Sequence, residues 1–253
     1  MKLRDLIIHL RRNILRDWSD RVGGSDDDRL WSDQHLVDWI NEGQRRLARK
    51  AFILRDDGPN DATMVQLRNG VDRYVLSDQV VAVISARYDA DQRDLQRVGH
   101  DEFNIGWRSD QEWFDPRWGV ALPPGRPVAF GMDETLQSEG GETFSAPVLK
   151  LWPAPDVAST GKFIRLRIAR LPRKFLLDDL DMPSEIPEDY QLECLSWAAF
   201  RALSIVDYDQ GAPERASAFR AQFEAMSIEA RRDVMRKMFT PNRWRFTAGA
   251  YTR

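Results

Sequence analysis

Apolar residues recur at helical spacing near the N-terminus of the chain. A first stripe is formed by Leu3, Leu6, Ile7, Leu10, Ile14 and Trp18, and this spacing predicts a packed helix. Ser32 is suited to cap a second helix, because its hydroxyl can accept a hydrogen bond from the first turn. The inward positions of that helix are Leu36, Trp39, Ile40, Leu47 and Ala51. Its C-terminal end is basic, as the helix dipole favours, with Arg45, Arg46, Arg49 and Lys50.

A helical hairpin is predicted further along the chain. Pro187 is suited to the first turn of a helix, where its missing N–H is no loss, and Glu188 and Asp189 suit the positive end of that helix. The inward face would carry Cys194, Trp197, Ala198, Ala202, Leu203 and Val206. After a break at residues 207–213, a second helix is predicted whose apolar face comprises Ala216, Phe219, Phe223, Met226, Ala230 and Val234. Such a hairpin needs another surface to pack against.

Between the helical ends, the apolar period shortens to that of strands. Short strands separated by Gly, Pro and Asp turns are predicted near residues 65–67, 74–76, 80–88, 128–130, 148–152 and 163–169. In the last of these strands apolar residues alternate with basic ones, so one face is expected in the core. The other face is basic and is expected to be solvated or to face a partner, and its residues are Arg165, Arg167 and Arg170.

Together these patterns predict an α+β fold. A helical bundle/hairpin platform from both chain ends would carry a β-rich insertion domain and an extended C-terminal tail. The expected divisions are N-terminal helices over 1–57 with a linker at 23–28, the insertion over 58–175, and the C-terminal hairpin over 176–238, packed on the N-terminal helices. Residues 239–253 would form the docking tail.

The predicted tail combines four aromatic residues and three arginines with no acidic residue. Ordering it costs roughly 1–2 kcal/mol per residue in backbone entropy, whereas each buried aromatic returns only about 1.5–3 kcal/mol. We therefore expect a tail that is loose in the monomer and fixed by a partner. The residues expected to dock are Phe239, Arg243, Trp244, Arg245, Phe246 and Tyr251.

Composition limits the classes of function. The 253 residues include 37 basic and 40 acidic ones, for a net charge of −3, so bulk attraction to nucleic acid or anionic membrane is not expected. A single cysteine excludes an internal disulfide framework and fits a reducing cytoplasm. No apolar run approaches the ~20 residues that span a bilayer. We expect a soluble protein assembled inside the cell, without membrane contact.

Neither the histidines nor the cysteine suggests catalysis. His9, His35 and His100 stand at unrelated positions. Cys194 lies among apolar neighbours on a predicted helix, without a spaced His or Asn, and is expected to be a packed structural residue.

The acidic residues do not form a recognisable site either. The segment 207–211 resembles half a calcium loop, but Ala212 stands at the sixth position and the closing glutamate is missing. Asp178, Asp179 and Asp181 could hold a cation or could simply form an acidic turn before a helix. We therefore predict no catalytic residue, no metal, no cofactor and no enzymatic activity.

Three segments, in order and at suitable spacing, resemble the head-to-tail adaptor (connector) proteins of tailed double-stranded DNA bacteriophages. The first is Ser-Asp-Gln-His-Leu-Val-Asp-Trp-Ile-Asn-Glu-Gly-Gln-Arg-Arg-Leu at 32–47, and the second is Leu-Trp-Pro-Ala-Pro at 151–155. The third runs from Pro183 to Asp209, with a Pro-x-x-Ile-Pro-x-x-Tyr entry and an Asp-x-Asp end. The resemblance covers about half of the chain.

This resemblance implies a structural protein of the virion neck, assembled in the cytoplasm of the host bacterium. Members of the family form a ring, usually dodecameric, beneath the portal protein, and their C-terminal segment reaches onto the portal. The ring would contact a tail or nozzle protein on its other side, and Arg165, Arg167 and Arg170 would then line an intersubunit or tail-facing surface. Packaged double-stranded DNA would pass through its centre without sequence-specific contact.

Two other functions are compatible with the sequence. One is a different neck or tail-completion protein. The other is a carbohydrate-binding module or an enzyme, whose aromatic loop with Trp107, Trp113 and Trp118 would stack on sugars.

Overall fold

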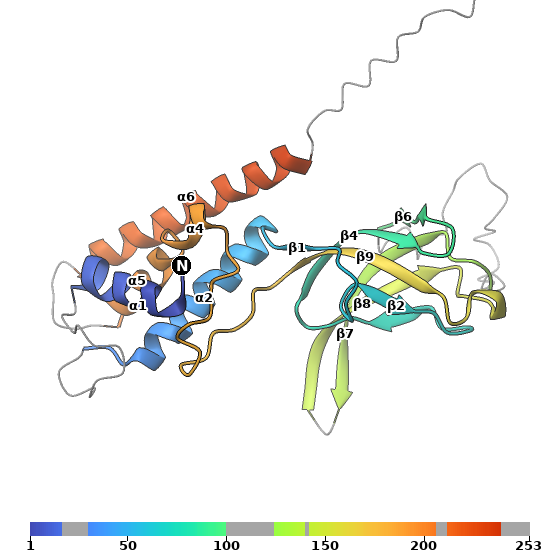
Figure 1. The fold of residues 1–253 in the computed structure, drawn as a ribbon, viewed down its shortest axis with the longest axis horizontal. Coiled ribbons are helices and arrows are strands. Elements are labelled where there is room, and N and C mark those ends of the chain that lie inside the picture. Colours follow the sequence, from blue (N-terminus) through green and yellow to red (C-terminus); the bar gives the residue numbers. More distant parts are fainter. Residues whose placement is uncertain (17–29, 100–123, 140–141, 206–211, 239–253) are drawn as a thin grey trace, which may run out of the picture.

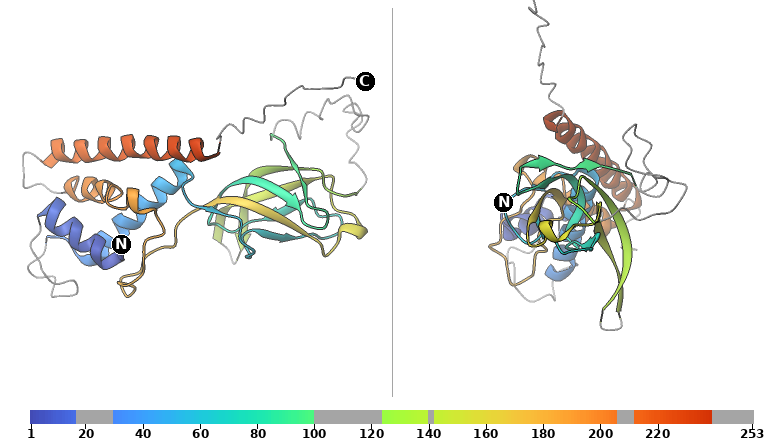
Figure 2. Two further views of the ribbon diagram at one scale, coloured as in Figure 1. Left: turned by 45° about the horizontal axis from the view of Figure 1, so that its top comes forward. Right: turned by 90° about the vertical axis from the view of Figure 1, so that its right-hand side faces the viewer.

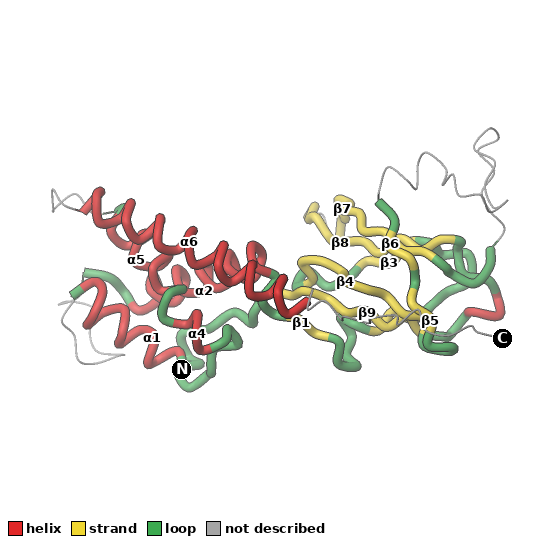
Figure 3. Tube along the Cα trace, turned by 90° about the horizontal axis from the view of Figure 1, so that it is seen from above, coloured by secondary structure: helices red, strands yellow, loops and turns green. Residues whose placement is uncertain are grey.

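The computed structural model describes residues 1–16, 30–99, 124–139, 142–205 and 212–238. Helices come from both ends of the chain and strands from its middle, which confirms the predicted α+β class. The helices gather at one end of an elongated molecule and the strands at the other (Figures 1 and 3). The chain passes between these two parts near β1 and again after β9 (Figure 1).

The helical part is built from both ends of the chain. Its elements are α1 (Leu3–His9), the π-helical η1 (Leu10–Leu15), α2 (Asp33–Ala51), α4 (Glu188–Gln191), α5 (Leu195–Leu203) and α6 (Ala212–Met238). As predicted, Ser32 caps α2, and its Oγ accepts a hydrogen bond of 3.2 Å from the His35 N–H. The first helix changes to π-helical spacing and ends at Arg16, which has a left-handed conformation.

Helix α2 contributes to two apolar clusters. Its N-terminal half packs with α1, η1 and α5, and its C-terminal half packs with α5 and α6. The helices lie close together along this length (Figure 2). Gly43 permits one close approach, since a Cβ atom there would lie 3.0 Å from the Cys194 carbonyl oxygen and 3.1 Å from the Trp197 Cβ.

The structure corrects the prediction of one regular helix starting at Pro187. That proline is the N-cap residue of α4, and helix assignment is interrupted between α4 and α5. The N–H groups of Leu195, Ser196 and Trp197 bond to carbonyls only three residues earlier. This tighter winding replaces regular α-helical hydrogen bonds at the interruption.

The β part contains two sheets around one apolar core. One sheet contains β1 (Arg55–Asp56), β2 (Met64–Gln66), β4 (Val80–Tyr88), β5 (Arg93–Asp94) and β9 (Phe163–Arg170). The other has the order β3 (Arg73–Val75), β8 (Glu142–Trp152), β7 (Ala129–Glu139) and β6 (Gln96–Arg97). Both sheets contribute side chains to the core, and its buried residues include Val83, Leu166, Phe130, Leu149 and Leu151.

The hairpin of β7 and β8 is longer than predicted. The sequence indicated strands only near 128–130 and 148–152, but each strand has 11 residues. Antiparallel pairing continues from Ala129↔Trp152 to Glu139↔Glu142, and the hairpin projects from the β part (Figure 1). Main-chain hydrogen bonds between β7 and β8 hold the longer hairpin together. The added residues are mostly polar, so the alternation of apolar residues did not predict these parts of the strands.

Several predicted features lie outside the described residues. They are the linker at 23–28, the tryptophan-rich loop, the loop at 207–211 and the docking tail. The division into four segments stays a prediction.

Candidate interaction surfaces

The predicted surface residues fall into two groups. The six tail residues Phe239, Arg243, Trp244, Arg245, Phe246 and Tyr251 lie outside the described residues, as do Trp107, Trp113 and Trp118. The three arginines of β9 are described, and the structure separates one of them from the other two.

Arg165 and Arg167 lie on the solvent-facing side of β9. Their side chains are 45% and 51% exposed. The Arg165 Nη2 lies 3.2 Å from Asp89 Oδ1, and the Arg167 Nε lies 4.0 Å from Asp57 Oδ2. Because about half of each side chain is exposed, both guanidinium groups are accessible to a partner. Exposed ion pairs of this kind contribute little to stability.

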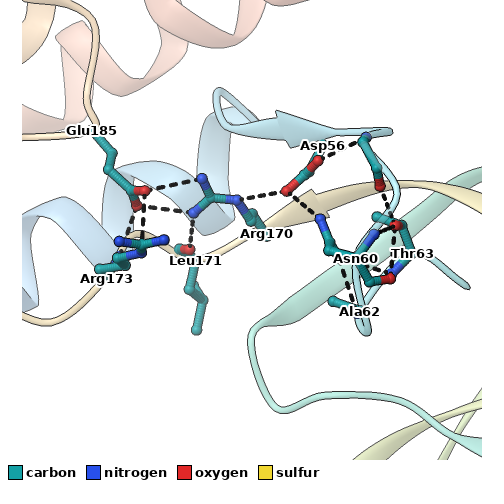
Figure 4. A network of polar contacts seen from close by, with 9 residues as sticks. Asp56, Asn60, Ala62, Thr63, Arg170, Leu171, Arg173 and Glu185 are labelled. Atoms are coloured by element: carbon teal, nitrogen blue, oxygen red, sulfur yellow. Dashed lines mark hydrogen bonds and ion pairs between the residues drawn. The ribbon is translucent and has the colours of Figure 1, made fainter.

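Arg170, in contrast, lies between the helical and β parts (Figure 4). Its side chain is only 22% exposed. Nη1 and Nη2 donate to the two carboxylate oxygens of Glu185 over 2.9 and 3.0 Å, and Nε lies 3.4 Å from Asp56 Oδ2. Two parallel hydrogen bonds to one carboxylate form a strong and directional contact. Arg170 therefore joins the end of β9 to the segment before α4.

Glu185 receives a further hydrogen bond of 2.9 Å from the backbone N–H of Arg173. Burial by itself raises the pKa of the Glu185 carboxyl, but the hydrogen bonds from Arg170 and Arg173 outweigh burial and lower that pKa below its ordinary value. The carboxylate is thus held in its charged form. We call Arg170, Glu185 and Asp56 the junction network.

On the β side, Asp56 also organises the turn that follows β1. Its Oδ1 accepts a 3.0 Å hydrogen bond from the Gly58 N–H, and its Oδ2 accepts one of 3.1 Å from the Asn60 side chain. Asn60 Oδ1 in turn accepts from the Thr63 N–H over 3.1 Å (Figure 4). The junction network therefore couples this turn to the loop that precedes α4.

A basic cleft runs along the solvent side of α2. Its volume is about 630 Å³, and its lining consists of Asp38, Asn41, Glu42, Arg45, Arg46, Arg49, Lys50 and Lys174. Arg46 pairs with Glu42 over 3.1 Å, and Lys50 pairs with Glu224 of α6. The other three cations, Arg45, Arg49 and Lys174, have no ion-pair partner among the described residues. "Basic cleft" below means these three residues and the cavity they line.

A second charged surface lies along α4 and α6. We define the acidic ridge as Glu188, Asp189, Glu193 and Glu229, for which no ion-pair partner occurs in the described part of the chain. Burial, and then the nearby charge of Glu229, raise the pKa of the Glu193 carboxyl. The two glutamates are therefore close enough to repel each other.

Tyr190, beside the ridge, donates a 2.7 Å hydrogen bond to Asp233 of α6. Burial and this hydrogen bond raise the pKa of Tyr190 to about 12. Asp233 also lies 3.2 Å from the Arg236 Nη1. This contact fixes α4 against α6 and so holds the ridge in one arrangement.

The cysteine and the described histidines have structural surroundings. Cys194 is buried, and burial raises the pKa of its thiol, which disfavours the reactive thiolate. His9 Nδ1 lies 2.8 Å from the Asn13 side-chain nitrogen. The His35 ring stacks on Trp39 with centroids 5.7 Å apart.

Among the acidic residues considered as cation ligands, Asp181 pairs with Lys2 over 3.2 Å. The described residues contain no group of three or more His, Cys, Asp or Glu side chains arranged to hold a metal ion. Within the same residues, no helix has the length and apolar character needed to cross a bilayer.

Sequence reasoning identified only part of these surfaces. Arg45 and Arg49 were explained by the dipole of α2, but nothing in the sequence places Lys174 beside them. The junction network was missed because Glu185 and Asp56 are distant in sequence from each other. No local pattern in the sequence indicates that Arg170 contacts Glu185 or Asp56.

A family model described as SU10 adaptor protein matches residues 1–245. No curated protein matches the chain.

Proposed function

Since the chain belongs to the SU10 adaptor protein family, we propose that it forms a homo-oligomeric ring between the portal and the tail. Membership in this family makes the chain a structural component of a bacteriophage that takes part in virion assembly. Adaptors of this kind interact with other head and tail proteins. The match over residues 1–245 is the observation that carries the proposal.

The division of the molecule into two parts supports a protein with two sets of neighbours. The helical part and the β part have separate apolar clusters and lie at opposite ends of an elongated molecule (Figure 3). An adaptor that joins two different assemblies needs two separate surfaces. In our proposal the β part, with Arg165 and Arg167, meets the tail or nozzle protein.

On the portal side, we assign docking to the C-terminal tail. Phe239, Trp244, Phe246 and Tyr251 would supply most of the binding energy, because buried aromatic side chains dominate interfaces. Arg243 and Arg245 would pair with acidic residues on the portal and make docking sensitive to salt. The ring is expected to be a dodecamer, assembled in the host cytoplasm, with the DNA passing through its centre.

A deletion of the gene in the phage genome tests this function. We expect infected cells to accumulate DNA-filled or leaking heads and separate tails. Addition of the purified protein to isolated heads and tails should restore joined particles, and the Trp244→Ala/Phe246→Ala variant should fail to do so. Heads that join tails normally in the absence of the protein would contradict the proposed function.

A further inference from the structure

Several charged side chains of α2, α5 and α6 are paired within the chain. Glu42 binds both Arg46 and Arg201, at 3.1 and 3.3 Å, and Glu224 binds Lys50. The basic cleft and the acidic ridge are two of the places where charges without an ion-pair partner among the described residues lie. Charges of the other sign are present nearby, with Asp38 in the lining of the cleft and Lys237 in a pocket that Asp189 also lines. These surfaces have opposite charge, with three cations on one and four carboxylates on the other.

The cleft and the ridge lie on different sides of the helical part. Gly43 of α2 faces α5, since a Cβ atom there would touch Cys194 and Trp197. At 3.6 residues per turn, Arg45 and Arg49 lie about 160° and about 120° around α2 from Gly43. Glu229 likewise lies about 140° around α6 from Glu224, the residue that pairs with Lys50 of α2. Arg45 and Arg49 therefore lie on the side of α2 turned away from α5, and Glu229 lies on the side of α6 turned away from the Lys50 contact.

We propose that the basic cleft of one copy binds the acidic ridge of a second copy. The inference rests on the proposed ring and names the surfaces that form it. A contact between two different surfaces of identical subunits is heterologous, and repetition of such a contact closes a ring when the rotation permits. Each copy uses its cleft toward one neighbour and its ridge toward the other.

The ridge has two features that suit a protein partner. Glu193 and Glu229 repel each other in the isolated chain, and a cation inserted from a neighbour relieves that repulsion. Leu192, next to Glu193, is 42% exposed and offers apolar area for the contact. On the other side, Arg45, Arg49 and Lys174 supply cations that lose no internal ion pair when they bind.

DNA phosphate is a less suitable occupant of the cleft. Two carboxylates, Asp38 and Glu42, line the same cavity as the cations. A continuous phosphate backbone would meet these carboxylates as well as the arginines, whereas a protein surface can place its acidic groups selectively. A DNA ligand would also leave the unpaired acidic ridge without a role.

Charge reversal with complementation tests the contact. The cleft variant is Arg45→Glu/Arg49→Glu and the ridge variant is Glu193→Lys/Glu229→Lys. A control with the same charge change as the cleft variant is Arg68→Glu/Arg93→Glu, at two exposed positions of the β part. Each protein is added to heads purified from an infection that lacks the adaptor, and the copies bound per head are counted by quantitative mass spectrometry.

We expect the cleft variant and the ridge variant each to lower the number of bound copies at least tenfold, and the control to bind like the wild type. An equimolar mixture of the two variants should restore binding, because a reversed cleft then meets a reversed ridge. Normal binding of both variants, or a mixture that restores nothing, would overturn the inference. If the wild-type protein still binds heads in that case, the proposed function stands and only the proposed contact between cleft and ridge fails.

A second measurement uses the unmodified protein and does not depend on heads or on the folding of variants. Wild-type protein, mixed from ¹⁴N and ¹⁵N preparations, is treated at high concentration with a carbodiimide that joins amines directly to carboxylates. We expect cross-links between the Lys174 of one copy and a ridge carboxylate of another. Such cross-links support the contact even if the protein fails to bind heads, and their absence both in solution and on heads refutes it.

One outcome would assign the cleft to DNA instead. In that case the cleft variant alone would bind heads in the normal number of copies, but the heads would lose their packaged DNA.

Discussion

Replacement of Arg170 by methionine tests the junction network directly. Methionine keeps an apolar side chain of similar length but removes the guanidinium that donates to Glu185 over 2.9 and 3.0 Å. The variant leaves Glu185 with the backbone N–H of Arg173 and a more distant contact to the Arg173 guanidinium at 3.8 Å. Asp56 loses its cation and keeps its bonds to Gly58 and Asn60.

The expected loss of unfolding free energy in the Arg170→Met variant lies between the values known for exposed and for fully buried ion pairs. Exposed pairs contribute about 0–1 kcal/mol, and removal of one partner from a buried pair costs about 3–5 kcal/mol. The side chains of Arg170 and Glu185 are 22% and 23% exposed, so they are mostly withdrawn from solvent. We therefore expect Arg170→Met to lower the free energy of unfolding by about 2–3 kcal/mol, in line with a hydrogen bond to a charged group.

The matched control is Arg165→Met on the same strand, where the ion pair with Asp89 is exposed. It should cost less than about 1 kcal/mol. Urea denaturation of both variants and of the wild type, followed by circular dichroism, measures the three free energies of unfolding. Equal losses in the two variants would show that the junction network does not stabilise the fold.

The pH dependence gives an independent check. The folded-state pKa of Glu185 is lowered from 4.5, so its contribution to stability is present above that ordinary value and is lost as the pH falls through the folded pKa. The Arg170→Met variant lacks most of this contribution at every pH. The difference in stability between wild type and variant should therefore shrink as the pH falls below 4.5. A difference that stays constant through this range would refute the reasoning.

Four further outcomes are expected. Deletion of residues 240–253 should leave the melting temperature almost unchanged and abolish retention of the protein on portal or purified heads in a pull-down. Arg165→Glu with Arg167→Glu should lower the free energy of unfolding by no more than about 0.5 kcal/mol per site but should block the joining of heads to tails. A large fall in melting temperature would show instead that these two arginines are structural. Gly43→Ala should gain about 1 kcal/mol of helix propensity but lose about 1–3 kcal/mol by overpacking, so denaturation should show net destabilisation. Mass photometry of the isolated protein should show monomers or weak oligomers, and a stable closed ring at nanomolar concentration would contradict this.

Elements with strong local patterns were predictable from the sequence. The apolar stripe and the Ser32 cap predicted α2, and the apolar stripe after residue 213 predicted α6. Strand β4 was predicted with the bounds that it has in the structure. In these segments, neighbours in the sequence determine both the period and the ends of the element, so one chain contains the necessary information.

Arg170 shows why alternation along β9 was not sufficient. The alternation at Arg165 and Arg167 breaks where Ile168 and Ala169 are both buried. At this place β4 has a register shift between Val80 and Ala82, opposite Arg170 and Ala169. A bulge in the partner strand changes the twist and the direction of side chains. The sequence of β9 alone therefore could not place Arg170 in the junction network.

The candidate surfaces were predictable only in part, because they combine distant segments. The basic end of α2 was evident, but Lys174 joins Arg45 and Arg49 only through the fold. The proximity of Glu193 and Glu229 likewise depends on how the segment between α4 and α5 packs against α6. Helix periodicity assigns a residue to a face of its own helix, but not to a neighbour on another helix.

An unpaired surface charge is not by itself evidence of a partner, because water solvates it at little cost. The distribution of the unpaired charges on this chain carries more weight than their existence. Arg46 and Lys50, one turn from the cleft cations, are paired within the chain, so partners for cations are available on the helical part. Arg45, Arg49 and Lys174 nevertheless have no ion-pair partner among the described residues, and the same holds for the four carboxylates of the ridge. A repeated contact between copies of this chain would satisfy both sets at once, whereas two different partners would each cover one set. Complementation between the two reversed variants separates these cases, so it is the decisive result, rather than the loss in either variant alone.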